Sequence, residues 1–370
     1  MTALDPEQRL LIDIRNIIIT FVIALSTGWL FLQAGMPAPY LMGALFGVWT
    51  SGVAFPSLQQ YLGVARWLHV PVVIGLGVLI GATFRQDTVA QASAWWLTVL
   101  TMIVITGAVT LLGYLFLRKR RGYEPRLAFL CSIPGGQVEA IMIAREMVDK
   151  DYVVALFHLV RVVIIFISTP FLLALIEGHD AVIRSNAALQ IMPSIFDLDI
   201  RQISIFAGLT GVGYVLARLS RMPMPHMLGP IGLSSLAHMT GWVELPRVYE
   251  FVILAQLIIG GAIGARLAKV PFRELFSYLK DATANIAIIL GGYVTAALAI
   301  AYASDASFLS IWLAFVPGGL YEVTLLALVF GFDVAFVAFH HTVRTIMIFM
   351  SLPIVVNRLK NTKADQTSWK

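Results

Sequence analysis

Ten apolar stretches, each about as long as a lipid bilayer is thick, constrain this 370-residue chain more than any other feature. The hydrocarbon core is about 30 Å thick, and a helix needs roughly 20 mainly apolar residues to cross it. The stretches lie at 16–34, 38–56, 67–84, 94–117, 152–176, 202–218, 224–242, 249–266, 284–303 and 333–356. Since no polar segment between them is long enough for a soluble domain, we predict an all-α polytopic membrane protein.

Composition supports this class and excludes others. Hydrophobic residues make up 59% of the chain and charged residues 13%, whereas a soluble domain is roughly 45–50% apolar and about 25% charged. We assign the net charge of +5 to cytoplasmic loops and expect no nucleic-acid partner. A single cysteine, Cys131, excludes an intrachain disulfide and a cysteine-based metal cage. We expect no cofactor and no metal site.

The chain is a tandem duplication. IRNI at 14–17 matches IRQI at 200–203, and MPAPYLMG at 36–43 matches MPMPHMLG at 222–229, both at an offset of 186 residues. Beyond these the offset is 183, and IPGGQVEA at 133–140 falls on VPGGLYEV at 316–323. We predict a first membrane repeat at 1–176, an inter-repeat loop at 177–199, a second repeat at 200–357 and a cytoplasmic tail at 358–370.

Positive charges predict how the repeats are oriented. Segments 126–147 and 308–331 are each interrupted by Pro-Gly-Gly. If both are re-entrant hairpins, each repeat has five crossings, and 20 Lys and Arg residues lie inside against four outside, namely Arg85, Arg184, Arg201 and Arg247. If both cross, the count is 15 against nine. The positive-inside rule favours hairpins, hence inverted repeats with both termini in the cytoplasm.

The interrupted segments are the first candidate site. Proline removes a backbone donor and glycine imposes little steric limit, so a helix breaks there and its freed polar groups tend to line a cavity. A glutamate follows three residues after each second glycine, in the first turn of the next half-helix, and is expected to bind a cation, carry a proton or cap the helix. The predicted substrate-binding residues are Pro134, Gly135, Gly136 and Glu139, with Pro317, Gly318, Gly319 and Glu322 in the second repeat.

The last span of each repeat carries a second candidate pair. His158 and Arg161 share one helix face, as do His341 and Arg344. An arginine inside a membrane must face protein or water. One alternative is a structural salt bridge between these arginines and the two glutamates. The other is an anion site at Arg161 and Arg344, with a histidine or glutamate carrying the coupling proton.

These duplicated motifs resemble the bacterial AbrB-duplication membrane family over about 14–356. The two Pro-Gly-Gly-x-x-Glu motifs and the later Val-Arg are the most specific features. The family is distinct from the small DNA-binding regulator of the same name, and its members carry transporter, regulator or ammonia-monooxygenase labels. The resemblance implies a multi-pass protein of the bacterial inner membrane but supplies no substrate and no catalytic residues.

Three functional classes follow. The leading one is a secondary transporter for a small solute, leaning to an organic anion, driven by H⁺ or Na⁺ because the chain has no nucleotide-binding signature. The first alternative is a membrane-bound oxidoreductase. A copper or zinc site needs clustered ligands, and the histidines of this chain are scattered along the sequence. The second is a membrane regulator acting through partners. We expect no enzyme, and name the substrate, the coupling ion and the lipid bilayer as partners. The oligomeric state stays open, with a homodimer among the options.

Overall fold

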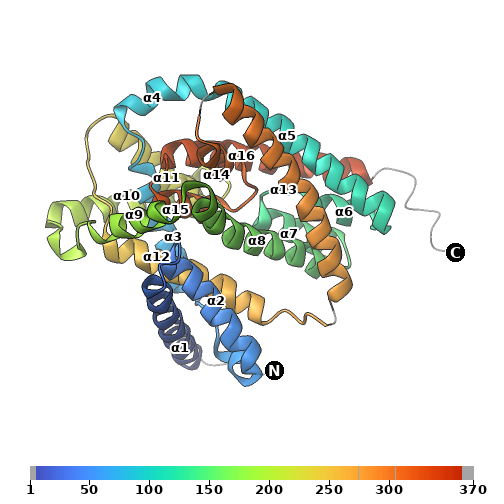
Figure 1. Cartoon of the computed structure of the whole chain (residues 1–370), viewed down its shortest axis with the longest axis horizontal. Helices are drawn as coiled ribbons and strands as arrows, with labels where there is room; N and C mark the ends of the chain where they lie inside the picture. The colour runs from blue at the N-terminus through green and yellow to red at the C-terminus, as the bar shows by residue number, and fades with distance from the viewer. Residues whose placement is uncertain (1–5, 274, 305, 361–370) are drawn as a thin grey trace. The chain divides into compact units, whose positions relative to one another are not determined.

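The computed structural model describes residues 6–273, 275–304 and 306–360, and within them all regular structure is helical (Figure 1). The first repeat contains α1 (Pro6–Gln33), α2 (Pro39–Ala54), η1 (Pro56–Tyr61), α3 (Arg66–Gly81), α4 (Gln86–Ala92), η2 (Ser93–Trp95), α5 (Trp96–Leu115), η3 (Phe116–Arg120), α6 (Pro125–Ser132), α7 (Gln137–Met147) and α8 (Asp151–Glu177). The remainder contains α9 (His179–Gln190), η4 (Ile195–Asp197), α10 (Ile200–Leu219), α11 (Pro225–Met239), α12 (Tyr249–Ala268), α13 (Phe276–Ser304), α14 (Phe308–Phe315), α15 (Leu320–Phe330) and α16 (Val334–Lys360).

Seven stretches of helix in the described residues are long and apolar enough to cross a membrane, as a polytopic membrane protein requires. The sequence predicted ten crossings. The other three, α2, α3 and α11, are only 15 or 16 residues long. At 1.5 Å per residue such helices reach about 24 Å, short of the hydrocarbon thickness. Proline at the first helical position starts α2 and α11, and both are largely buried.

Two other sequence expectations concern connecting segments. The stretch 177–199, predicted as a loop between the repeats, contains the twelve-residue helix α9. The predicted tail begins inside α16, which continues to Lys360, and residues 361–370 lie outside the described part of the chain.

The helices gather into two compact units, and each unit takes segments from both sequence repeats. Unit 1 comprises Met1–Ala92, Phe166–Pro271 and Thr324–Ala335. Unit 2 comprises Ser93–Ile165, Phe272–Val323 and Phe336–Lys370. All the motif residues predicted to form the site belong to unit 2.

Close glycine contacts join the two repeats inside unit 1. A Cβ atom built at Gly81 of α3 would lie 2.6 Å from Ile231 O of α11. A Cβ atom at Gly264 of α12 would lie 2.5 Å from Leu45 O of α2. Since α3 corresponds to α12 and α2 to α11 in the duplication, each repeat packs one glycine-lined helix against the other repeat, as small residues allow.

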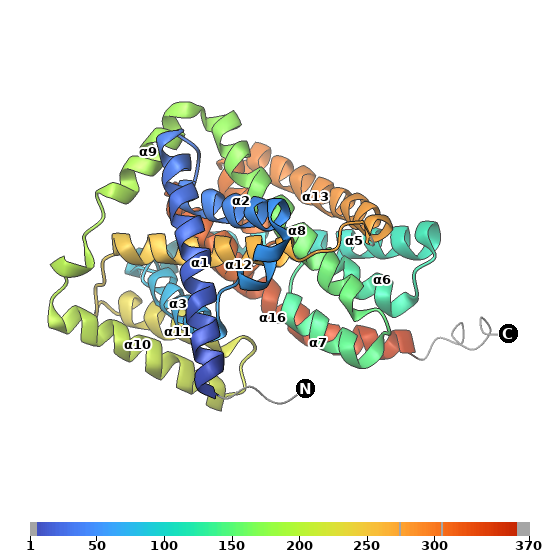
Figure 2. The same ribbon diagram turned by 90° about the horizontal axis from the view of Figure 1, so that it is seen from below.

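Unit 2 has its own apolar core, to which both repeats contribute. Helices α5 and α13 run side by side, as Figures 1 and 2 both show. The two interrupted segments have matching lengths: α6 and α14 have 8 residues each, and α7 and α15 have 11 each. Helices α8 and α16, which carry the His-x-x-Arg motifs, have 27 residues each and contain one internal proline.

Candidate functional site

The helix breaks lie where the sequence predicts them, at the two Pro-Gly-Gly motifs. Gly136 precedes α7 with φ 58° and ψ 42°, a left-handed conformation that glycine adopts at no steric cost. Gly319 precedes α15, and a Cβ atom built there would overlap the carboxylate of Glu322. The second glycine of each motif therefore serves a different local need: backbone conformation in the first repeat and space for a folded-back side chain in the second.

The two buried arginines bind the carbonyl groups that the breaks leave without intrahelical donors. Arg161 Nη1 donates to Ile133 O at 2.6 Å. Arg344 Nη1 donates to Phe315 O and Val316 O at 2.8 and 3.0 Å, and Nη2 donates to Gly318 O at 3.2 Å. The carboxyl end of a helix carries partial negative charge, so a cation there is favourable. Each guanidinium group therefore caps the carboxyl end of a short helix, α6 or α14.

The histidines hold these arginines in place with the same geometry in both repeats. His158 Nε2 lies 3.2 Å from Leu130 O, and His341 Nε2 lies 2.9 Å from Leu313 O, both 28 residues earlier in the chain. Arg161 and Arg344 each direct Nη2 at the Nδ1 atom of their own histidine. A carbonyl oxygen only accepts and a guanidinium only donates, so this arrangement requires a neutral ring with its hydrogen on Nε2.

Glu322 does not pair with these arginines among the described residues. The hydrogen bonds of Arg344 go to three carbonyl groups and to His341. Those of Arg161 go to Ile133 O and His158. Glu322 is buried and folds back against the start of its own helix, as a capping residue does. Glu139 lies in the first turn of α7, and its side chain is outside the described residues.

The sequence reasoning missed two polar contributors from unit 2. The fully buried Tyr293 of α13 shares a 2.7 Å hydrogen bond with Thr106 Oγ1 of α5 and lies close enough to both guanidinium groups to interact with them. Asn285 of α13 donates to Gly113 O and to Ser132 Oγ, both at 3.2 Å. The available signal was the presence of Asn285 and Tyr293 within one mainly apolar span.

The two breaks converge on one positively charged centre in unit 2. A Cβ atom built at Gly135 of the first repeat would lie 3.8 Å from Arg344 Nε of the second. Arg161 Nε is buried and has no hydrogen-bond partner among the described residues. Among the described residues these two buried guanidinium groups have no carboxylate partner, and one of them has an unused donor, so the described side chains leave their positive charge unbalanced.

The described residues contain no group of three His, Cys, Asp or Glu side chains that could hold a metal ion.

Comparison with known proteins gives a family and no activity. Residues 47–360 match the model of the AbrB family, described as transition state regulatory protein AbrB. A relative in Bacillus subtilis (strain 168), the uncharacterized protein YhjN, is 22% identical over 319 residues, which cover 82% of each chain. No solved structure matches the chain. Because the family model covers most of the chain, including both Pro-Gly-Gly motifs and both His-x-x-Arg motifs, this protein belongs to the AbrB family.

Proposed function

We propose that the protein is a secondary transporter of the bacterial inner membrane that moves a small organic anion by ion-coupled alternating access. In this proposal the two repeats are inverted, each with five crossings and one re-entrant hairpin, and both termini are cytoplasmic. Inverted repeats with interrupted helices are the architecture of many secondary transporters. The count of 20 positive residues inside against four outside supports this orientation.

The observation that carries the substrate class is the uncompensated charge of Arg161 and Arg344. Both side chains are almost fully buried, at 2% and 1% exposure, and neither meets a carboxylate among the described residues. A buried cation without a counter-ion is costly, and a bound carboxylate removes that cost. The unused Arg161 Nε supplies a donor that a ligand oxygen can accept from.

Glu139 and Glu322 are the proposed carriers of the coupling ion. The histidines suit this role less well, because each accepts from an arginine and donates to a carbonyl in a neutral form. Glu139→Gln and Glu322→Gln should therefore abolish gradient-driven accumulation of substrate while leaving expression intact. If both variants misfold instead, a purely structural role for the glutamates is favoured.

Thermal stability of the purified protein across a panel of carboxylic acids, amines and metal ions tests the proposal. A ligand at 100 times its Kd stabilises a protein by about 2.7 kcal/mol, which such a scan detects. We expect a shift with one class of acid, reduced in Arg161→Lys because lysine lacks the planar fork that grips a carboxylate. A shift with copper or zinc alone would favour an oxidoreductase. A full shift in Arg161→Lys would remove Arg161 from the substrate site.

A further inference from the structure

A cavity of about 940 Å³ lies in unit 1, where three connecting segments meet. Its lining comes from residues 82–87 between α3 and α4, from 188–193 around the end of α9, and from 238–247 between α11 and α12. None of these residues belongs to the centre in unit 2. The volume lies within the range of roughly 300–1,000 Å³ typical of small-molecule sites.

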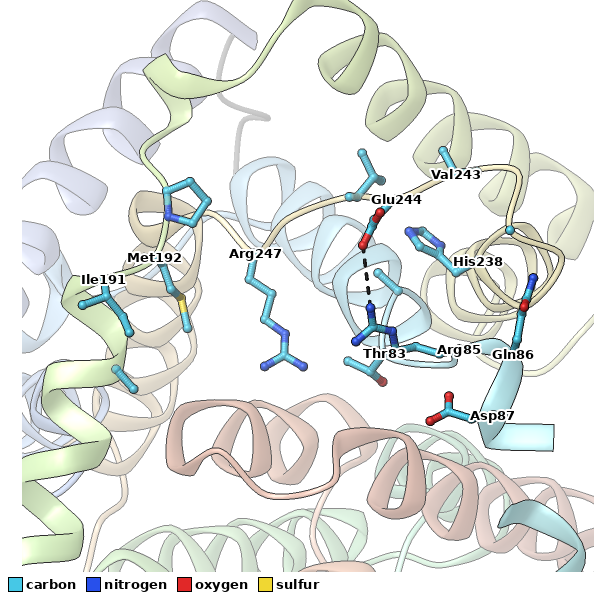
Figure 3. Close-up of a pocket in the computed structure, with 15 residues that line it drawn as sticks. Thr83, Arg85, Gln86, Asp87, Ile191, Met192, His238, Val243, Glu244 and Arg247 are labelled. Atoms are coloured by element: carbon cyan, nitrogen blue, oxygen red, sulfur yellow. Dashed lines mark ion pairs between the residues drawn. The ribbon is translucent and has the colours of Figure 1, made fainter. Parts of the chain in front are cut away.

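One charged side chain in this cavity has no hydrogen-bond or ion-pair partner among the residues that the structure describes. Figure 3 shows the guanidinium group of Arg247 pointing into the open space from the segment that precedes α12. The side chain is half-buried, and it makes no hydrogen bond or ion pair with a described residue. Burial and the guanidinium group of Arg85 lower the pKa of Arg247. Arg247 therefore directs positive potential into the cavity, and the exposed Arg85 adds a weaker charge that water screens.

The acidic residues of the lining do not cancel this potential. Glu244 lies 3.7 Å from Arg85, and both side chains are largely exposed, so the pair is weak and screened by water and salt. Asp87 is also exposed, in the first turn of α4. Among the charged residues of the lining, Arg247 is the least accessible to water, so its charge is the least screened. The cavity therefore favours a bound anion.

The duplication allows the cavity walls to be compared with the equivalent segments of the other repeat. At the offset of 183–186 residues, the wall segments 82–87 and 238–247 correspond to 265–270 and 52–61 of the same unit. There Lys269 Nζ donates to Leu62 O at 2.7 Å, and Gln59 Nε2 donates to Gly52 O at 3.0 Å. A Cβ atom at Gly52 would lie 2.6 Å from Ala268 Cβ. At the equivalent positions these described residues therefore bond to and pack on one another, whereas Arg247 faces open space.

The rest of the lining suits an organic molecule. Ile191 and Met192 on one side of the cavity and Val243 on the other add apolar side chains to its lining (Figure 3). The buried Nε2 atom of His238, whose Nδ1 lies 2.7 Å from Ser234 O, has no partner among the described residues. We propose that this cavity binds a small soluble carboxylate, which Arg247 holds by its charged end, with Arg85 nearby, and whose carbon skeleton contacts the apolar side chains of the lining. A planar carboxylate matches a guanidinium fork, and the acids at the rim disfavour a doubly charged phosphate.

Binding to the purified full-length protein tests this site without any transport. Calorimetric titration uses acetate, succinate, citrate and inorganic phosphate as probes. We expect at least one carboxylate to bind with a Kd that Arg247→Gln raises about tenfold or more, the scale on which one charge-assisted contact acts. The matched control Arg184→Gln, exposed in the same unit and outside the cavity, should leave the Kd within about twofold. Equal affinities in the two variants, or no carboxylate binding, would overturn the proposal.

Thiol labelling then locates the bound carboxylate. In a Cys131→Ser background, Val243→Cys reports on the cavity and Ile183→Cys is the exposed control in the same unit. A saturating carboxylate should slow labelling at 243 and leave 183 unchanged. Protection by phosphatidylglycerol nanodiscs alone would show a lipid headgroup and overturn the soluble ligand. Equal rates at 243 with and without carboxylate would overturn the location. Neither the titration nor the thiol labelling requires transport. A negative transport assay would therefore leave the result for this cavity unchanged.

Discussion

At the scale of single residues, the two arginines of unit 2 have unequal hydrogen bonding although their motifs are repeats. Arg344 donates to three carbonyl groups and to His341, whereas Arg161 donates to one carbonyl group and to His158. The Nε atom of Arg161 is left without a partner among the described residues. We therefore infer that Arg344 chiefly holds its helix break together, and that Arg161 is the arginine with donor capacity left for a ligand.

Lysine substitutions separate these two roles. Arg344→Lys should lower the free energy of unfolding by about 2–4 kcal/mol, because one ammonium group with three donors cannot reproduce the four contacts that Arg344 makes from two nitrogens. Arg161→Lys should cost about half as much, since fewer contacts depend on the fork. Reversible unfolding of the purified variants measures both values. A cost for Arg161→Lys equal to or above that for Arg344→Lys would refute the division of roles.

A second residue-scale prediction concerns Tyr123 of unit 2, in the loop between η3 and α6. Its hydroxyl donates to Asp281 Oδ2 at 3.1 Å, and Asp281 also pairs with Arg121 at 2.9 Å. Burial, followed by the charge of Asp281 and the hydrogen bond to it, raises the pKa of Tyr123 above the ordinary value of 10.0. A pKa raised by folding stabilises the protein fully below the unfolded value, and this contribution is lost as pH rises above about 10.

The stability difference between the wild type and Tyr123→Phe should therefore be constant from pH 7 to about 9 and shrink above about pH 10. Unfolding midpoints of both proteins, measured side by side at each pH, give this difference. The subtraction removes the effect of other groups that titrate in the same range. A difference that stays constant or grows at alkaline pH would show that folding does not raise the pKa of Tyr123.

At the scale of helices, the sequence predicted the breaks but not what binds their ends. Pro134 and Pro317 remove a donor and the glycines after them favour non-helical backbone, so local chemistry alone locates the interruption. The binding of the freed carbonyl groups by arginines 26–29 residues later depends on tertiary packing, which no local pattern encodes. For the same reason the contribution of Tyr293 was missed, and the short lengths of α2, α3 and α11 were not foreseen.

Alanine substitutions test the local requirement at a break. Gly319→Ala should destabilise the protein by about 1–3 kcal/mol, because the new methyl group takes the place of the Glu322 carboxylate. The matched control in the same unit is Gly107→Ala in α5, where no atom lies within 4 Å of the added carbon. It should be neutral or stabilising by about 0.5–1 kcal/mol, as for glycine in a helix interior. The same thermal scan measures both, and a harmless Gly319→Ala would contradict the packing of Glu322 against the break.

At the scale of the whole molecule, the duplication read from the sequence does not coincide with the compact units. Each unit combines segments of both repeats, because the glycine-lined helices of one repeat pack on the other. A sequence reveals repeats through matching residues. Which helices pack together depends on tertiary contacts, and these are not visible in the sequence. The orientation of the repeats across the membrane is a separate prediction, which rests on the positions of Lys and Arg residues.

Cysteine accessibility tests that orientation. In a Cys131→Ser background, Val148→Cys and Phe332→Cys mark positions just after the two interrupted segments. With inverted repeats, a membrane-impermeant thiol reagent added to intact cells should label position 332 and label 148 only after the membrane is opened. Labelling of both positions from the same side would exclude inverted repeats.

The central claim, that the charged centre of unit 2 binds an anion for transport, is tested most directly by counterflow in proteoliposomes. Vesicles preloaded with an unlabelled carboxylate chosen from the stability panel are diluted into the same compound in radiolabelled form. Labelled molecules exchange for unlabelled ones, so the assay needs no ion gradient and no net movement of charge. We predict saturable uptake by the wild type, loss of uptake in Arg161→Lys, and normal uptake in the matched exposed variant Arg184→Lys. Wild-type vesicles that exchange no carboxylate faster than protein-free vesicles, or full activity in Arg161→Lys, would contradict the account.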